Sequence, residues 1–266
     1  MTSAKSREVD ARLRVGLEIA LKAADGTLSA FYKGNPKTIT KSDGTPVTLT
    51  DRRAERFLRD SIAKAFPRDG VLGEEYGETP GSSGFRWIID PIDGTQSFIR
   101  GVPLYGTLVG VEFEKEVCIG VMVLPALEEY LYASRGNGAW WAKKGARPKR
   151  AKVSATVRLE EAFVCMTSVN TFALRDRMAA FEQLRSSVKR MRGWGDCYGF
   201  ALVATGRADA MLDGVMSSWD LAAIKPIIEE AGGRFTDWKG VPTIYGKDAV
   251  ATNSKLHGAL LKALNG

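Results

Sequence analysis

The sequence predicts an α/β fold, in which helices cover layers of β-sheet. Three observations support this class. The chain of 266 residues, 44% of them hydrophobic, can bury a substantial core. Its N-terminal part shows two amphipathic helical patterns, followed by short apolar segments with the composition of strands. The C-terminal half alternates strand-like and helix-like segments, as layered α/β proteins do.

Helical periodicity dominates the beginning of the chain. Apolar residues recur at spacings of three and four from Leu13 to Phe31, which predicts one long amphipathic helix. A second helix is predicted from about Thr50 to Phe66, where Pro67 ends it. The segment between them, KTITKSDGTPVTLTD, is rich in Thr, Gly and Pro and predicts a hairpin or a loop.

Short apolar runs, separated by Gly, Pro or charged turns, then predict one mixed or antiparallel sheet. The runs are VLG, FRWIID, LYGTLVGVEF, VCIGVMVLP and EYLYASR. The basic segment KKGARPKRAK interrupts the hydrophobic pattern near Lys143 to Lys152. We expect a boundary there between an N-terminal α+β lobe, residues 1–150, and a C-terminal α/β lobe, residues 151–266. A solvated loop would explain the same segment.

The second half alternates between the two kinds of element. Strands are predicted at AFVCMTS, KRMRGW and ADAMLD. Helices are predicted near ALRDRMAAFEQLRSS, from GDCYGFALVATG, and from Ser218 to Ala231, where Gly232 and Gly233 would end the last one.

Composition argues against several classes of function. The net charge of +7 is spread among 31 acidic residues, so a dedicated nucleic-acid site is not favoured. The three cysteines are widely spaced, which supports neither a disulfide framework nor a zinc site. No apolar run approaches the length of a membrane span and no signal peptide is evident, so we expect a cytoplasmic protein without a membrane partner. His257 is the only histidine, and we do not expect it to be catalytic.

The segment WIIDPIDGTQSFIRG carries the strongest chemical signal. We expect Asp90 at the end of a buried strand, Pro91 in a turn, and the carboxylate of Asp93 close to that of Asp90. Gly94 and Thr95 would open a short helix whose free N–H groups can hold an anion. Two carboxylates this close repel each other unless a cation or a shared proton lies between them.

A helix-capping turn would explain one aspartate of this segment but not both. A calcium-binding loop would need an acidic spacing that the segment lacks. Glu74 and Glu75 follow another short strand, and Asp220 lies in the first turn of a predicted helix. Together these acidic residues indicate one cation site.

The motifs GEEYG, WIIDPIDGTQSF and WDLAA followed by EEAGG occur in an order and at separations that resemble the inositol monophosphatase family of magnesium-dependent, lithium-sensitive phosphatases. The resemblance runs from about Arg12 to Gly233. It implies a layered α/β/α/β/α sandwich of the inositol monophosphatase/fructose-1,6-bisphosphatase type. It also implies a homodimer that hydrolyses a small phosphate monoester.

The resemblance assigns roles to individual residues. The implied ligands of two or three Mg²⁺ ions are Glu74, Asp90, the backbone carbonyl of Ile92, Asp93 and Asp220. Residues implied in catalysis are Glu74, Thr95 and Asp51, the last two as a pair that orients the metal-activated water for in-line attack. Residues implied in binding the substrate are Asp93, Gly94, Thr95, Trp194, Gly195, Asp196, Asp213 and Asp220. A ligand set of hard oxygens also favours Mg²⁺ over zinc.

The segment WGDCYG resembles the histidinol-phosphate phosphatase branch of the family, whose substrate carries an ammonium group. Asp196 would repel a phosphate but attract such a cation, and Asp213 would add to the attraction. The alternatives are a helix cap for Asp196, and an inositol monophosphatase or a broad sugar-phosphate phosphatase for the protein. A non-catalytic anion-binding or RNA-binding protein on this fold is the alternative from another class. Gly195 replaces the family's usual serine or threonine, and Pro226 interrupts the helix after Asp220.

Overall fold

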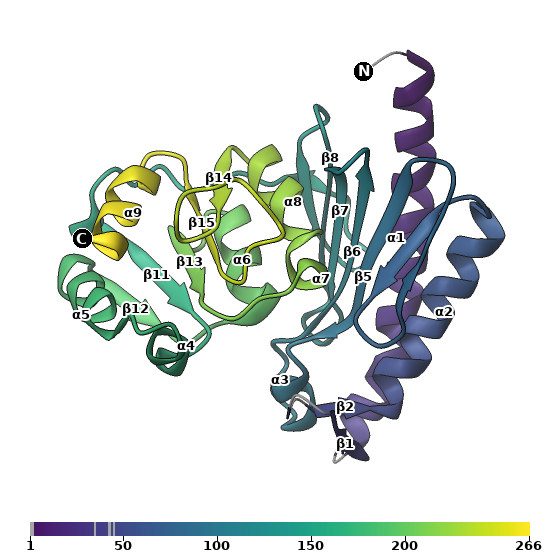
Figure 1. Ribbon diagram of the computed structural model, residues 1–266, viewed down its shortest axis with the longest axis horizontal. Helices are drawn as coiled ribbons and strands as arrows, with labels where there is room; N and C mark the ends of the chain where they lie inside the picture. The colour runs from purple at the N-terminus through teal and green to yellow at the C-terminus, as the bar shows by residue number, and fades with distance from the viewer. Residues whose placement is uncertain (1–2, 35, 42–43, 45) are drawn as a thin grey trace.

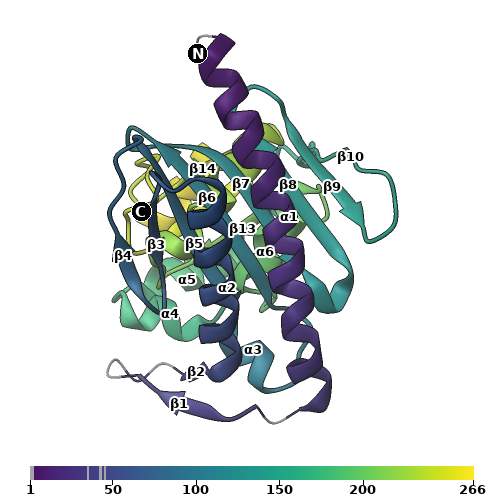
Figure 2. The same ribbon diagram turned by 90° about the vertical axis from the view of Figure 1, so that its right-hand side faces the viewer.

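A computed structural model describes residues 3–34, 36–41, 44 and 46–266 (Figures 1 and 2). Helix α1 (Ser3–Lys33) and helix α2 (Leu49–Ala65) are the two predicted N-terminal helices. Strands β1 (Thr38–Thr40) and β2 (Pro46–Thr48) pair antiparallel, so the predicted hairpin is confirmed. Residues 42–43 and 45 of its loop lie outside the described residues.

The first sheet has eight strands in the order β10-β9-β8-β7-β6-β5-β3-β4. Its strands are β3 (Gly70–Gly73), β4 (Gly77–Thr79), β5 (Phe85–Asp93), β6 (Gly106–Phe113), β7 (Glu116–Leu124), β8 (Glu129–Ser134), β9 (Ala139–Lys143) and β10 (Lys149–Arg150). Strands β3 and β5 pair in parallel and the other neighbours pair antiparallel, so the predicted mixed sheet is confirmed. The basic segment KKGARPKRAK includes the β9–β10 turn. The division into lobes at residue 150 stays a prediction.

The second sheet has five strands in the order β12-β11-β13-β15-β14. They are β11 (Phe163–Met166), β12 (Arg190–Arg192), β13 (Ala210–Asp213), β14 (Gly233–Thr236) and β15 (Ala249–Asn253). The helices of this half are α4 (Val169–Leu174), α5 (Met178–Ser187), α6 (Asp196–Ala204), α7 (Ser218–Leu221), α8 (Ile224–Glu230) and α9 (His257–Asn265).

Two helix predictions need correction. The segment ALRDRMAAFEQLRSS is not one helix, because α4 ends at Leu174 and α5 begins at Met178. The single helix predicted from Ser218 to Ala231 is broken between α7 and α8. Pro226 has no backbone N–H, so it cannot donate the helical hydrogen bond to the carbonyl of Ala222.

The elements stack in five layers, which confirms the predicted α/β/α/β/α sandwich. Helices α1 and α2 cover the outer face of the eight-stranded sheet, and α6, α7 and α8 lie between the two sheets (Figure 1). Helices α5 and α9 pack together on the far face of the second sheet. Figure 2 views the first layer face-on, with α1 and α2 crossing in front of the large sheet. Within the described residues, no helix has the length and apolar character needed to cross a membrane.

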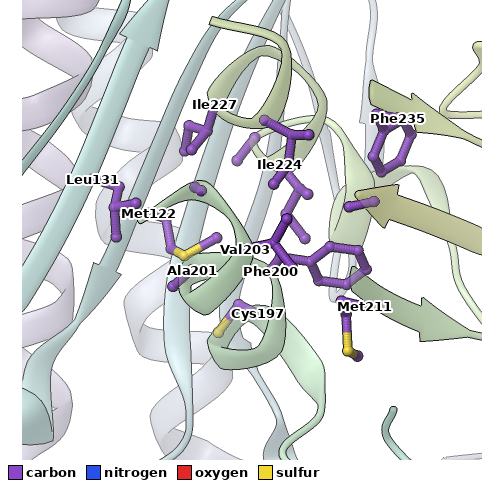
Figure 3. Close-up of a cluster of buried hydrophobic side chains, with 14 of the residues drawn as sticks. Met122, Leu131, Cys197, Phe200, Ala201, Val203, Met211, Ile224, Ile227 and Phe235 are labelled. Atoms are coloured by element: carbon purple, nitrogen blue, oxygen red, sulfur yellow. The ribbon is translucent and has the colours of Figure 1, made fainter. Parts of the chain in front are cut away.

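A buried apolar cluster fixes the middle layer (Figure 3). It joins Met122 and Leu131 of the large sheet to Phe200 and Val203 of α6 and to Ile227 of α8. All five side chains are at most 1% exposed, and burying each one contributes about 1.5–3 kcal/mol. The cluster therefore holds the helices of the middle layer against strands β7 and β8 of the large sheet.

The junction of α7 and α8 lies unusually close to the large sheet. A Cβ atom added at Gly110 on β6 would lie 2.6 Å from the Cβ of Ala222. A Cβ atom at Gly120 on β7 would overlap the carbonyl of Ala223. These glycines let the junction approach the sheet, and this approach places the preceding Asp220 beside β5.

Candidate functional site

Both aspartates of the DPIDGT motif lie on β5, at the end where α3 (Thr95–Ile99) begins. The turn predicted at Pro91 is wrong, because the strand continues through it with a bulge. Asp90 pairs with Leu108 and Asp93 pairs with Gly106. An advance of three residues along β5 is therefore matched by two residues along β6, which leaves one extra residue on β5. Residues three apart in a regular strand point to opposite faces, and the extra residue of a bulge brings them to the same side.

Helix α7 supplies the third aspartate. Asp220 Oδ2 accepts a hydrogen bond from the backbone N–H of Ser217 at 2.7 Å, in a capping box that fixes the side chain. Asp90, Asp93 and Asp220 each offer a carboxylate oxygen, and these three atoms lie within 4.8 Å of one another. The structure thus brings together three residues that the sequence placed in the cation site.

The electrostatics of this cluster are unfavourable without a cation. Burial raises the pKa of Asp90 well above its ordinary value, and the charges of Glu74, Asp93 and Asp220 raise it further. Burial, followed by the neighbouring carboxylates, raises the pKa of both Asp93 and Asp220 to about 7. Each shift has the sign expected for like charges removed from water.

Glu74 and Glu75 lie in the turn between β3 and β4, and both form ion pairs with the same lysine. The Lys41 ammonium lies 2.7 Å from Glu74 Oε1 and 2.6 Å from Glu75 Oε1. Burial alone would lower the pKa of Lys41, but the two carboxylates outweigh it and the net shift is upward. Sequence reasoning missed Lys41, because a single lysine in a polar loop carries no signal of its own.

Asp51 and Thr95, which the resemblance pairs, each form hydrogen bonds elsewhere. Asp51 Oδ2 accepts hydrogen bonds from the backbone and hydroxyl of Thr48, in the capping box that begins α2. Its other oxygen is buried and makes no hydrogen bond within the described part of the chain. The Thr95 hydroxyl donates to the carbonyl of Ile92 at 3.1 Å.

The described residues fit Mg²⁺ in three respects. Carboxylate oxygens are its preferred protein ligands, and one such oxygen from each of the three aspartates lies within 4.8 Å of the other two. The buried oxygen of Asp51 lacks a hydrogen-bond partner among these residues. The raised pKa values of Asp93 and Asp220 also indicate negative charge that a cation would neutralise.

A pocket of about 270 Å³ opens beside this cluster. Its lining comprises Gly44, Pro46, Glu74, Gly94, Thr95, Gln96 and Asp196. Gly94 adopts a left-handed conformation with φ of 81°, which glycine allows without strain and which starts α3 at Thr95. The backbone N–H groups at the start of α3 are therefore available to an anion in the pocket.

Asp196 borders the pocket on the side of α6. Its Oδ2 lies 3.5 Å from the Ser97 hydroxyl, and a Cβ atom added at Gly94 would lie 3.0 Å from the same oxygen. Burial, followed by the charges of Asp93 and Asp213, raises the pKa of Asp196 to about 8. Among the described residues the Asp196 carboxylate accepts from the Ser97 hydroxyl and from no backbone N–H of α6, so the helix-cap alternative has no support in the contacts.

The remaining predicted substrate residues lie around the start of α6. Asp213 is 3% exposed, and its oxygens accept from the hydroxyl of Thr167 and from the backbone N–H of Val215. Trp194 is 41% exposed and packs against Phe163, with the ring centroids 5.6 Å apart. Trp194 is therefore not part of the core.

Cys197 forms a further contact with the acidic cluster, and the sequence did not reveal it. Its backbone N–H donates to Asp93 Oδ2 at 2.5 Å, so the first turn of α6 is tied directly to the acidic cluster. Cys118, Cys165 and Cys197 are all buried free thiols. The contribution of Cys197 to the site therefore comes from its backbone.

His257 lies apart from this site, at the start of α9. It is 4% exposed, and its ring nitrogens lie 3.2 Å and 3.0 Å from the hydroxyls of Thr236 and Thr252. Burial, with a smaller contribution from Arg234, lowers its pKa to about 4. A structural role follows from these contacts.

We expect His257 to make the protein less stable in mild acid. Between pH 6.5 and 4 the unfolded chain protonates this residue while the folded protein keeps it neutral, so stability falls as pH falls. The full effect is roughly 3 kcal/mol in the free energy of unfolding. In urea unfolding across this pH range, the free energy of unfolding of His257→Gln should fall correspondingly less in acid than that of the wild type. Because the carboxylates are common to both proteins, equal pH slopes would contradict the assignment.

Comparison with known proteins agrees with this geometry. Residues 8–266 match the model of the inositol monophosphatase family. Histidinol-phosphatase of Chlorobaculum parvum is 42% identical over 253 residues, which cover 95% of this chain and 96% of that protein. Histidinol-phosphatase of Mycobacterium tuberculosis is 39% identical, with coverage of 95% and 97%. The extragenic suppressor protein suhB from Bartonella henselae superposes with a TM-score of 0.85 at 29% identity, over 95% of this chain and 97% of that one. With its fold, its acidic motifs and these relatives in agreement, the chain belongs to the inositol monophosphatase family.

Proposed function

We propose that this protein is a Mg²⁺-dependent phosphatase that hydrolyses histidinol phosphate to histidinol and phosphate. The observation that carries the proposal is the position of Asp196. Its carboxylate lies against Gly94, in the same pocket as the start of α3 and beside the three aspartates. A second acidic group at this place suits a substrate with a phosphate at one end and a cation at the other.

Two or three magnesium ions would be held by Glu74, Asp90, the carbonyl of Ile92, Asp93 and Asp220. When bound, magnesium would supply Lewis-acid activation of water and charge stabilisation at the leaving oxygen. The capping box at Asp220 and the hydrogen bond from Cys197 to Asp93 would keep two of these carboxylates oriented before the substrate arrives.

The chain itself would bind and align the phosphate. Backbone N–H groups of Gly94 and Thr95 lie at the pocket end of α3 and would donate to phosphate oxygens. Asp51 and Glu74 would be the candidate proton acceptors for the attacking water, because burial raises the pKa of both carboxyl groups. Lys41, which neutralises Glu74 and Glu75, would limit the repulsion of an incoming phosphate dianion.

The alcohol end of the substrate would meet Asp196. An ammonium group beside this carboxylate favours its charged form and forms a charge-assisted hydrogen bond. A neutral sugar alcohol offers no such compensation for burying the charge. The two relatives named histidinol-phosphatase at 42% and 39% identity support the same substrate.

A substrate panel tests the proposal. We expect kcat/KM for histidinol phosphate to exceed that for inositol phosphate, fructose bisphosphate and adenosine bisphosphate, measured by phosphate release with Mg²⁺. A higher kcat/KM for inositol phosphate would favour the alternative that the protein is an inositol monophosphatase.

Inhibition by lithium, a homodimer and a cytoplasmic location stay predictions from the sequence. Sedimentation equilibrium would measure the oligomeric state. Phosphate release in the presence of lithium would measure the inhibition.

A further inference from the structure

One hydroxyl group connects Asp196 and Asp213, the two acidic residues that the resemblance places at the alcohol end of the proposed substrate. Thr167 follows directly after β11, and its Oγ1 donates a hydrogen bond to Asp213 Oδ2. The same Oγ1 accepts a hydrogen bond from the backbone N–H of Asp196 at 3.1 Å. A hydroxyl can donate and accept at once, so no other atom is needed to join the two residues.

The backbone around Thr167 is built for this close approach. Gly195 is buried, and a Cβ atom added to it would overlap both the Cα and the hydroxyl oxygen of Thr167. Any side chain at Gly195 would therefore push Thr167 away from the start of α6. This explains why glycine stands at the position where the resemblance leads one to expect serine or threonine.

The amide held by Thr167 belongs to a residue in an uncommon conformation. Asp196 has a φ of 49°, in the left-handed region that non-glycine residues rarely adopt. Such a conformation persists only where neighbouring contacts impose it. The contacts here are Thr167 on the N–H of Asp196 and Asp93 on the N–H of Cys197. Between them they set the direction of the Asp196 side chain.

We infer that Thr167 is a positioning residue for substrate selection, which holds Asp196 and Asp213 where they meet a cationic alcohol group. The inference rests on the proposed histidinol phosphate substrate. The hydrogen bonds of the Thr167 hydroxyl lead to these two residues and not to the three clustered aspartates, so Thr167 acts on recognition and leaves the phosphate chemistry to that cluster.

Removal of the hydroxyl should weaken the binding of the cation. Thr167→Val keeps the shape of the side chain, but it leaves the N–H of Asp196 without this acceptor and Asp213 without one of its donors. Asp196 would then lose the contact that holds its backbone. Because the ammonium contact exists in both the bound substrate and the transition state, its loss should raise KM more than it lowers kcat.

Steady-state kinetics on three variants test this inference. For Thr167→Val we expect KM for histidinol phosphate to rise about tenfold and kcat to change by less than about twofold. Glycerol phosphate, which has no cation, should change little in either parameter. Thr167→Ser keeps the hydroxyl and should restore KM. Thr171→Val is the matched control, since the Thr171 hydroxyl on α4 donates to the carbonyl of Ser168, the N-cap of that helix, and to neither acidic residue.

A double-mutant cycle adds a readout that general damage would not produce. If Thr167 acts through Asp196, Thr167→Val should add little to the loss in an Asp196→Asn background. Additive effects would overturn the inference, and so would a wild-type preference for histidinol phosphate that survives in Thr167→Val. A wild-type protein with no preference for histidinol phosphate over glycerol phosphate would overturn the proposed substrate itself, and the role of Thr167 with it.

Discussion

Asp93→Asn is expected to lower the rate of phosphate-ester hydrolysis by about 10³-fold or more, the scale of removing one strong electrostatic element from a transition state. Asp93 lies in the group of three carboxylates whose oxygens are within 4.8 Å of one another, and it is 8% exposed. The amide keeps the size and one oxygen for the Cys197 N–H, so the substitution removes mainly charge. The measurement is phosphate release at saturating Mg²⁺.

The stability of the same variant provides the control. The pKa of Asp93 is raised from 3.8 to about 7 in the folded protein without metal, so this group's contribution to stability is lost as pH rises through that range. At pH 8 and without metal, Asp93→Asn should therefore be more stable than the wild type, on the order of 1 kcal/mol in the free energy of unfolding. Added Mg²⁺ should raise the melting temperature of the wild type and have less effect on the variant.

Chelation tests the same site without a mutation. EDTA should abolish activity and Mg²⁺ should restore it, whereas Ca²⁺ should restore it poorly because its coordination is larger and less regular. Full activity in EDTA, or a variant that loses activity together with its folded structure, would contradict the assignment of Asp93 to a magnesium site.

Asp196→Asn should change substrate preference more than any other single substitution in the pocket. Asp196 is the acidic residue on the α6 side of the pocket, and within the described residues its carboxylate accepts only a 3.5 Å hydrogen bond from the Ser97 hydroxyl. We expect kcat/KM for histidinol phosphate to fall by about ten- to a hundredfold, the value of one hydrogen bond to a charged group. The carboxylate-to-amide change preserves size, so the loss reports the charge.

Glycerol phosphate distinguishes lost recognition from general damage. Its hydrolysis should be little changed by Asp196→Asn, and a modest gain would follow from weaker repulsion of the phosphate. Damage to the fold or to the metal site would lower the kcat/KM of both substrates together. An unchanged rate for histidinol phosphate would mean that Asp196 does not contact the cation, and the proposed substrate would then have to be withdrawn.

The sequence alone determined the fold class and the chemistry of the site. The apolar spacing from Leu13 to Phe31 predicted α1, and the alternation of short segments predicted strands and helices in the second half of the chain. These signals are local, because the periods of helices and strands are properties of neighbouring residues. Three acidic motifs in fixed order predicted a cation site, and the structure gathers three of their aspartates.

Only the tertiary structure decided how those residues meet. The bulge in β5 depends on its register with β6, and no pattern within DPIDGT distinguishes a bulge from a turn. Lys41 reaches Glu74 and Glu75 from a segment 33 residues earlier in the chain. The hydroxyl of Thr167 reaches Asp213 across 46 residues. Such contacts arise where separate elements pack, so their geometry is set by register and close approach and not by any local pattern of residues.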